Sequence, residues 1–341
     1  VLRGFCAPVK LVMQYSDEDL AFLMARDTDS FNRWEAGQTL FTRAVLANIS
    51  AFEQGKAMSV TPLLVEAVKK TLLDENIERS LQAFTITMPS LSSLAEELSQ
   101  VDPDSLVAAT QFVEKTLAAA LRDQFLQVYS KNVLPKEPFR MDAEAVGMRR
   151  IKNACLKYIM SLDDTEGAQL ALKQCLDAGC MTDLWSSTMY LASSSNDQIR
   201  KDGLEHFFKQ AQGNDLSLCK WFTIQAVADR PDVLSTVTGL LGHPDFSLKN
   251  PNKCRALCAF QDNMRHFHAK DGSGYAWITD RIIEVDKITA QVSARLVSSL
   301  SSFRKFDPAR QALMKAQLER LAATEGLSKD AFEIVSRSLK G

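Results

Sequence analysis

The sequence lacks the short motifs that mark most common catalytic and nucleotide-binding sites. It has only four histidines in 341 residues. It contains no Gly-x-x-x-x-Gly-Lys-Ser/Thr loop, no Gly-x-Gly-x-x-Gly, no Gly-x-Ser-x-Gly and no His-Glu-x-x-His. The sequence therefore contains no motif for a P-loop, for dinucleotide binding, for an α/β-hydrolase or for the zinc-binding helix of a metallopeptidase. We predict no catalytic residue in this chain.

An excess of positive charge is also absent. The chain carries 40 Lys and Arg against 42 Asp and Glu, for a formal net charge of −2. No basic field would attract a phosphate backbone or an anionic lipid surface. No apolar run approaches the ~20 residues that a membrane-spanning helix requires. With 46% hydrophobic and 24% charged residues, the composition is typical of a soluble globular protein, and we expect no nucleic-acid or membrane partner.

The cysteines do not suggest a disulfide framework. There are seven, an odd number, scattered from Cys6 to Cys258. This usage is typical of buried or free thiols in a reducing compartment. We therefore expect a cytoplasmic location, with an organelle as the alternative.

Helix start and stop signals punctuate the chain from Ser16 onward. Ser16 and Ser90 each precede an amphipathic run. Four further starts place a side-chain oxygen at the N-cap and a proline at the first helical position, where the missing N–H costs nothing. They are Thr61-Pro62, Asp102-Pro103, Asn250-Pro251 and Asp307-Pro308. The glycines at expected left-handed helix ends are Gly55, Gly179, Gly213 and Gly326. These signals predict about seventeen helices joined by short loops.

Apolar residues recur at helical spacing within these segments. Two stripes are formed by Val292, Leu296, Leu300 and Phe303 and by Val113, Leu117, Ala120 and Leu121. No repeat of fixed period is visible, so a regular tetratricopeptide or ankyrin array is not supported. The fold class that we predict is all-α: an irregular superhelical αα-solenoid of short antiparallel helix pairs, of the HEAT or armadillo kind. Pro135 and Pro138 predict a bend between two stacks.

The nearest approach to a metal site combines Cys254 and Cys258 with His266 and His268. Thiols at i and i+4 would share a helix face, and zinc prefers thiolate and imidazole ligands. Zinc sites more often carry a tight Cys-x-x-Cys knuckle, whereas two thiols on a core helix and two loop histidines need no metal. We therefore predict packing thiols and no metal in this segment.

The segment from Phe267 to Tyr275 has the composition of a corner between two helices. Gly272 and Gly274 permit positive φ, and Ser273 between them can cap the following helix. We therefore predict a tight turn that leads directly into a helix.

Several separated motifs together resemble the C-terminal part of aminopeptidase N, a family of zinc-dependent alanyl aminopeptidases. They appear in the family's order and extend from Leu2 to about Arg310. The motifs are Leu2-Arg3-Gly4-Phe5-x-Ala7-Pro8-Val9-Lys10-Leu11, Phe31-x-Arg33-Trp34-Glu35-Ala36-x-Gln38, Asn153-Ala154-Cys155-Leu156, Met181-Thr182-Asp183, Lys220-Trp221-Phe222, Asn250-Pro251-Asn252, Phe267-His268-x-x-Asp271-Gly272-Ser273-Gly274-Tyr275 and Gln291-Val292-x-x-Arg295-Leu296. The chain also begins at Val1 within an apolar, proline-containing segment, which we interpret as the middle of a longer polypeptide.

The resemblance implies a piece of a four-domain enzyme. Residues 1–12 would be the final strand of a small β-sandwich domain, and residues 13–341 the C-terminal helical superhelix. In such enzymes the helical domain contacts and closes over the catalytic domain, leaving a chamber that admits peptides but not folded proteins. The zinc ligands and the catalytic glutamate belong to that upstream domain, so no cofactor is expected in this segment.

Two arginines match family motifs and are the candidate substrate-binding residues. Arg255 follows the Asn250-Pro251-Asn252 motif, and Arg295 lies one turn after Gln291. By resemblance, both line the chamber on the C-terminal side of the substrate. A guanidinium suits that role, because it stays charged and holds a carboxylate with paired hydrogen bonds. An arginine that only faces solvent is the alternative interpretation of Arg295.

The function that the resemblance implies is the removal of N-terminal amino acids from peptides by a zinc-dependent parent enzyme. In this interpretation the segment encloses the chamber, controls substrate access and is inactive alone, and the parent is a monomer. The rival hypothesis is an independent HEAT-like helical scaffold that binds protein partners. A His-Glu-x-x-His motif upstream of Val1 in the same polypeptide would distinguish the two.

Overall fold

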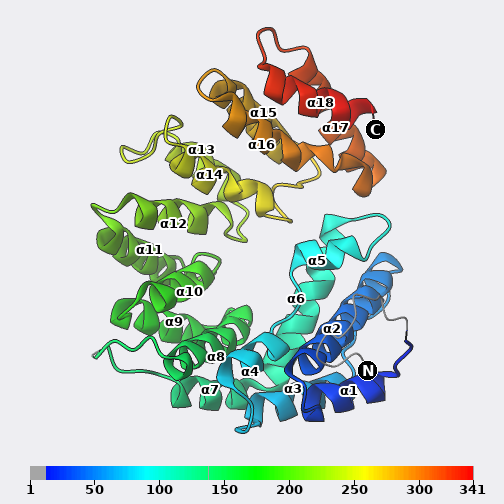
Figure 1. Cartoon of the computed structure of the whole chain (residues 1–341), viewed down its shortest axis with the longest axis vertical. Coiled ribbons are helices and arrows are strands. Elements are labelled where there is room, and N and C mark those ends of the chain that lie inside the picture. Colours follow the sequence, from blue (N-terminus) through cyan, green and yellow to red (C-terminus); the bar gives the residue numbers. More distant parts are fainter. Residues whose placement is uncertain (1–12, 137, 341) are drawn as a thin grey trace. The chain divides into compact units, whose positions relative to one another are not determined.

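The computed structural model describes residues 13–136 and 138–340, which form helices and no β-sheet (Figure 1). The all-α prediction is confirmed. These residues contain 18 α-helices, close to the number expected from the start and stop signals. None of the helices is long and apolar enough to cross a membrane. The predicted strand at residues 1–12 lies outside the described residues.

The helices follow one another through short connections and group into two compact units. Their bounds are α1 (Asp17–Arg26), α2 (Ser30–Glu53), α3 (Pro62–Leu73), α4 (Arg79–Ile86), α5 (Leu91–Glu96), α6 (Pro103–Ala120), α7 (Arg122–Lys131), α8 (Ala143–Ser161), α9 (Thr165–Asp177), α10 (Met181–Leu191), α11 (Asp197–Ala211), α12 (Asp215–Ala226), α13 (Val233–Leu240), α14 (Pro251–Cys258), α15 (Ser273–Asp286), α16 (Ala290–Ser301), α17 (Pro308–Ala322) and α18 (Lys329–Lys340). Two short 3-10 helices are η2 (Ala259–Asp262) and η3 (Phe303–Lys305). The first unit contains residues 13–94 and 108–190, and the second unit contains residues 95–107 and 191–340.

The predicted helix starts are confirmed at their N-caps. Ser16 and Asp19 form a capping box, in which the Asp19 N–H donates to Ser16 Oγ at 3.1 Å and the Ser16 N–H donates to Asp19 Oδ2 at 3.2 Å. Thr61, Asn250 and Asp307 cap proline-containing first turns with a side-chain oxygen. These oxygens accept N–H groups that have no partner inside the helix.

Three of the four glycines predicted to end helices adopt left-handed backbone angles. Their φ values are 64° at Gly55, 78° at Gly213 and 77° at Gly326. Gly179 is not among the residues with positive φ, so the prediction is wrong there. A Cβ atom at Gly179 would lie 3.2 Å from Cα of Lys136, and the missing side chain therefore serves close packing after α9.

Helix α8 is the centre of the first unit, where it packs against α4, α7 and α9. Phe125 of α7 and Tyr158 of α8 are buried and stack with their ring centroids 4.5 Å apart. The Tyr158 hydroxyl donates to the carbonyl oxygen of Ile86 in α4 at 2.6 Å. Three helices are therefore joined around one pair of rings.

The predicted stripe on α6 is mostly confirmed. Val113, Leu117 and Leu121 are buried. Ala120, the last residue of α6, is exposed, so the prediction is wrong for that residue. Ala118 is buried instead.

The loop between α7 and α8 does not separate two stacks. Pro135 and Pro138 lie in this loop, but the residues on both sides of it belong to the first unit. The predicted boundary is therefore wrong. A proline prevents a helix from continuing, and after this interruption α8 packs against α7.

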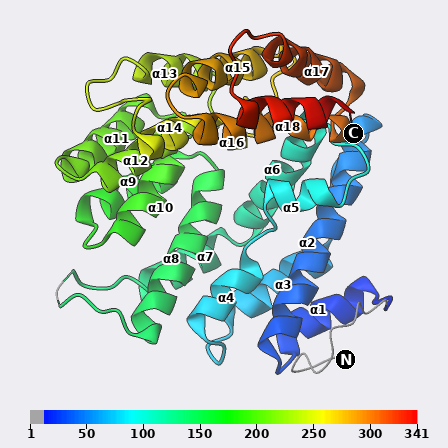
Figure 2. The ribbon, with the colours of Figure 1, turned by 45° about the horizontal axis from the view of Figure 1, so that its top comes forward.

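In the second unit, neighbouring helices pack in succession (Figure 2). Helix α12 contacts α11, α13 and α14, and α15 contacts α16 and α17. The second predicted stripe is confirmed, because Val292, Leu296, Leu300 and Phe303 are all buried. Helix α16 carries most of this stripe and packs against α15, α17 and α18.

Residues 95–107 complete the second unit although they come early in the chain. The Asp307 N–H donates to the carbonyl oxygen of Val101 at 3.0 Å. The buried Arg310 donates to Asp104 Oδ2 at 2.9 Å. Backbone hydrogen bonds and an ion pair therefore hold this segment against the start of α17.

Candidate functional site

Arg255 lies on the exposed side of α14, whose other side is buried. Cys254 and Cys258 belong to the buried side, and α14 packs against α12. Asn250 Oδ1 accepts the Asn252 N–H at 3.0 Å and begins the helix. The Arg255 guanidinium donates to Asn252 Oδ1 at 2.5 Å, and the described residues offer it no other partner. Most of its N–H groups are therefore available to a ligand.

Arg295 is exposed on α16 and lies beside the buried stripe. Its neighbours Ala294 and Leu296 are buried, whereas Gln291 and Arg295 are exposed. Within the described residues the Arg295 guanidinium makes no hydrogen bond or ion pair. Both predicted binding arginines are thus accessible in the second unit, and their role in binding stays a prediction.

The cysteines and histidines considered as metal ligands are each engaged elsewhere. Cys254 and Cys258 are free, buried thiols, and the hydrogen bond between them together with burial raises the pKa of Cys258. His266 Nε2 lies 2.9 Å from a carboxylate oxygen of Asp229. In residues 13–136 and 138–340, no three His, Cys, Asp or Glu side chains are grouped so that they could hold a metal ion.

The corner before α15 is tight, as predicted, but its residues act differently. Gly272 has a φ of 72° and is itself the N-cap. The prediction that Ser273 caps the helix is wrong: its hydroxyl donates to Asp271 Oδ1 at 2.7 Å. Gly274 does not adopt positive φ. A Cβ atom there would lie 2.2 Å from the carbonyl oxygen of Phe267, so Gly274 permits close approach of the backbone.

His268 lies within this corner, four residues before Gly272, and is buried in the core. Its ring stacks on Phe306 at a centroid distance of 4.3 Å, and its Nδ1 lies 2.9 Å from the Tyr275 hydroxyl. Burial, together with the nearby charge of Arg310, lowers the pKa of His268 to about 3. The imidazole is therefore neutral at pH 7 and cannot act there as an imidazolium acid.

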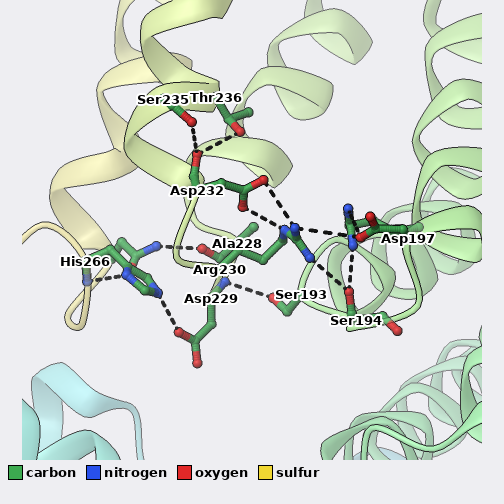
Figure 3. A network of polar contacts seen from close by, with 12 residues as sticks. Ser193, Ser194, Asp197, Ala228, Asp229, Arg230, Asp232, Ser235, Thr236 and His266 are labelled. Atoms are coloured by element: carbon green, nitrogen blue, oxygen red, sulfur yellow. Dashed lines mark hydrogen bonds and ion pairs between the residues drawn. The ribbon is translucent and has the colours of Figure 1, made fainter.

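A polar network that the sequence analysis missed joins loops of the second unit (Figure 3). Arg200 and Arg230 both donate to the carbonyl oxygen of Ser194, at 2.9 and 3.2 Å. Each guanidinium also has a carboxylate partner, Asp197 for Arg200 at 2.5 Å and Asp232 for Arg230 at 2.9 Å. The two acids offset the two positive charges that meet at one carbonyl group.

The same network continues to His266 (Figure 3). The Asp229 carboxylate faces His266, and the Asp229 N–H donates to Ser193 Oγ at 3.0 Å. In a nucleophilic triad the histidine stands between the serine and the carboxylate. Here the serine oxygen accepts a backbone N–H instead. The arrangement connects three loops and does not form a catalytic triad.

A buried polar cluster also lies in the first unit, at two of the sequence motifs. Lys152 Nζ donates to Asp183 Oδ2 at 2.7 Å, and Asn153 Nδ2 donates to Asp183 Oδ1 at 3.0 Å. Gln174 Nε2 donates to Asn153 Oδ1 at 2.7 Å and its Oε1 accepts from the Tyr129 hydroxyl at 3.0 Å. Buried charges require such partners, and both oxygens of Asp183 have one.

The comparisons with known proteins agree with the resemblance seen in the sequence. Residues 17–340 match a family model described as "Domain of unknown function (DUF3458_C) ARM repeats". Aminopeptidase N of Escherichia coli (strain K12) is 33% identical over 341 residues, which is 99% of this chain and 39% of that protein. Aminopeptidase N of Haemophilus influenzae is 34% identical over 100% of this chain and 39% of its own length.

A solved structure shows the same fold. Aminopeptidase A of Legionella pneumophila, in complex with aspartic acid, matches with a TM-score of 0.87 at 30% sequence identity. The match covers 99% of this chain and 40% of that one. The ARM-repeat description confirms the armadillo-like class, and the chain spans about two fifths of the length of the curated relatives that it matches. The chain therefore belongs to the DUF3458_C family of ARM-repeat domains, and it is similar to a part of proteins named aminopeptidase N.

Proposed function

We propose that this chain encloses the substrate chamber of a zinc-dependent aminopeptidase that removes N-terminal amino acids from peptides. The observation that carries the proposal is the similarity to two proteins named aminopeptidase N over 99% and 100% of the chain. The match covers only 39% of each relative. More than half of such a parent is therefore left for a separate catalytic domain, which this helical domain would contact.

Catalysis is assigned to that remaining part of the parent. The sequence has no His-Glu-x-x-His motif, and the described part of the chain groups no three side chains that could bind a metal. The described residues do not fit a catalytic zinc, so we derive no chemical step from them. The contribution of this segment is to limit which substrates reach the catalytic domain.

Arg255 and Arg295 are the side chains that we assign to substrate binding. Both are exposed on the second unit. A peptide carries a C-terminal carboxylate, which a guanidinium can hold with two parallel hydrogen bonds. Arg255 already donates to Asn252, whereas Arg295 has no partner among the described residues. We therefore expect Arg295 to contribute more to peptide binding.

The test compares two substrates in the full-length parent enzyme. A free tripeptide presents a carboxylate, whereas an amino-acid anilide presents none. A charge-assisted contact contributes about 1.5–3 kcal/mol, so Arg295→Ala should lower kcat/KM for the tripeptide by about ten- to a hundredfold. Arg255→Ala should have a smaller effect in the same direction. Turnover of the anilide should stay unchanged in both variants.

The matched control is Arg337→Ala, which removes an exposed arginine from α18. It should leave both substrates unaffected. The melting temperature of every variant is measured as well. An equal loss on the tripeptide and the anilide, or a large fall in melting temperature, would show that Arg255 and Arg295 stabilise the domain and do not bind the peptide.

We also propose that the parent enzyme is a cytoplasmic monomer, with an organelle as the alternative location. The odd number of cysteines, seven, and their scattered positions support a reducing compartment. Light scattering of the purified parent enzyme and fractionation of the cells that produce it would test the two statements. A dimer, or recovery in a secreted fraction, would contradict them.

A further inference from the structure

A cavity of 320 Å³ lies in the first unit beside the buried Lys152–Asp183 pair. The end of α7, the loop after it, α8, α9 and the start of α10 contribute to its lining. One part of the lining is apolar and consists of Val133, Leu134, Pro135, Phe139 and Leu170. Val133 and Phe139 stay exposed, so the cavity opens to solvent. Its volume suits a small organic molecule.

The charged part of the lining is predominantly positive. It contains Lys136, Arg149, Lys152 and Lys173 against Asp177 and Asp183. Both acids are already engaged: Asp183 accepts from Lys152 and Asn153, and Asp177 accepts from Lys173 at 2.6 Å. The unbalanced charge in the cavity is therefore cationic, which favours an anionic ligand.

Lys152 and Arg149 have hydrogen-bond donors that the described chain does not use. The Lys152 side chain is 5% exposed, and of its three N–H groups one donates to Asp183. The buried Arg149 donates from Nη2 to the carbonyl oxygen of Arg140 at 2.8 Å and lies over the Phe139 ring at 5.2 Å. The two residues are one turn apart on α8, on the same face of the helix. Buried cationic donors without acceptors are unfavourable, so an acceptor in the cavity would stabilise them.

We propose that this cavity binds a small organic carboxylate. The carboxylate group accepts hydrogen bonds from Lys152 and Arg149, and the hydrocarbon part of the ligand packs against Leu134, Phe139 and Leu170. The proposal does not depend on the peptidase activity of the parent, because all of the residues belong to the first unit of this chain. Water alone in the cavity is the competing outcome.

The test titrates the 341-residue chain with 3-phenylpropanoate and with its neutral amide, followed by calorimetry and ligand-detected NMR. An anion of this size should bind with a Kd on the order of 1 mM. The amide has the same shape but no charge, so its Kd should be at least about tenfold higher. Equal Kd values for the two compounds, or no binding of either one, would overturn the proposal.

The variant Lys152→Met/Asp183→Asn removes the ammonium group together with its counter-ion, so no unpaired carboxylate is left buried. It should raise the Kd of 3-phenylpropanoate about tenfold. The matched control is Lys173→Met, because Lys173 lines the same cavity but its side chain is 75% exposed and paired with Asp177. It should change the Kd less than about twofold. An equal loss of affinity in the two variants would show that any positive charge near the cavity has the same effect, and it would overturn the proposal.

A third variant keeps the test decisive if the double substitution prevents folding. Leu170→Trp narrows the cavity without altering Lys152, Asp183 or Arg149. It should abolish binding of 3-phenylpropanoate while the helical circular dichroism stays unchanged. Undiminished binding to a folded Leu170→Trp protein would place the ligand elsewhere on the chain and refute the assignment.

Discussion

Replacing Arg310 with methionine would test the ion-pair cluster that completes the second unit. The Arg310 side chain is 3% exposed. It donates to Asp102 Oδ1 at 3.1 Å, Asp104 Oδ2 at 2.9 Å, Asp307 Oδ2 at 2.8 Å and the carbonyl oxygen of His268 at 2.7 Å. Methionine keeps much of the volume and removes every one of these donors.

The magnitude follows from the burial of the cluster. Removing one partner of a buried ion pair costs about 3–5 kcal/mol, because the other partner is left without compensation. The three carboxylates are 22–35% exposed, so water replaces part of the loss, and Lys270 Nζ stays 3.1 Å from Asp104. We therefore expect Arg310→Met to lower the free energy of unfolding of the second unit by about 3 kcal/mol.

Hydrogen exchange under native conditions is the suitable assay, because a chain with two units need not unfold in one step. Amides of residues 95–107 and of the start of α17 should lose protection, while those of α7 and α8 should keep it. The matched control is Arg320→Met in the same helix, which breaks an exposed pair with Asp280 and should cost less than about 1 kcal/mol. A loss of under about 1 kcal/mol for Arg310→Met would refute the reasoning.

The same cluster predicts how stability depends on pH. Burial raises the pKa of Asp104 and of Asp307, but hydrogen bonds from Arg310 outweigh burial and leave each pKa below its ordinary value. A carboxyl group with a lowered pKa stabilises the fold above its unfolded-state pKa, near 3.8, and this stabilisation is lost as the pH falls further. Unfolding of Arg310→Met should show a weaker dependence on pH in that acidic range.

Two further predictions concern the corner before α15. Gly274→Ala should destabilise the second unit by about 2 kcal/mol or more in urea unfolding, because the added Cβ would lie 2.2 Å from the Phe267 oxygen. The control is Gly239→Ala, which has nothing within 4 Å of its Cβ and should stabilise the second unit by about 0.5 kcal/mol. Equal effects of the two substitutions would contradict the prediction. Since burial lowers the pKa of His268 to about 3 from 6.5, its contribution to stability should be complete above pH 6.5 and decline as the pH falls towards 3. His268→Gln should flatten that decline, and a His268 ring proton that titrates in NMR between about pH 5 and 8 would refute the assignment.

Helix boundaries could be predicted from the sequence because capping is local. Ser16 and Thr61 act on N–H groups only three residues away, so the pattern and the structure agree. The two glycines of the corner show the limit. Gly272 and Gly274 look alike in the sequence, but the first adopts positive φ and the second avoids a collision with Phe267. That collision is a tertiary contact, which no local pattern reports.

The candidate site, too, could be predicted from the sequence only in part. Helical periodicity predicts that Arg295 is exposed, because its position in the helix falls outside the buried stripe to which Leu296 belongs. Its assignment to substrate binding, in contrast, came from resemblance to a family. The network around Ser194, Arg230 and His266 could not be predicted, because its members are far apart in the chain and meet only through tertiary packing.

The place of residues 95–107 in the second unit has a consequence for synthesis on the ribosome. Asp102 precedes its partner Arg310 by 208 residues. At about 5–20 residues per second, translation takes about 10–40 s to cover that distance. During this time the early segment has left the ribosome while α17 has not yet been made. We therefore expect the first unit to be able to fold before the second unit, which closes only after α17 has emerged from the ribosome. A polypeptide truncated before Arg310 should leave the second unit open.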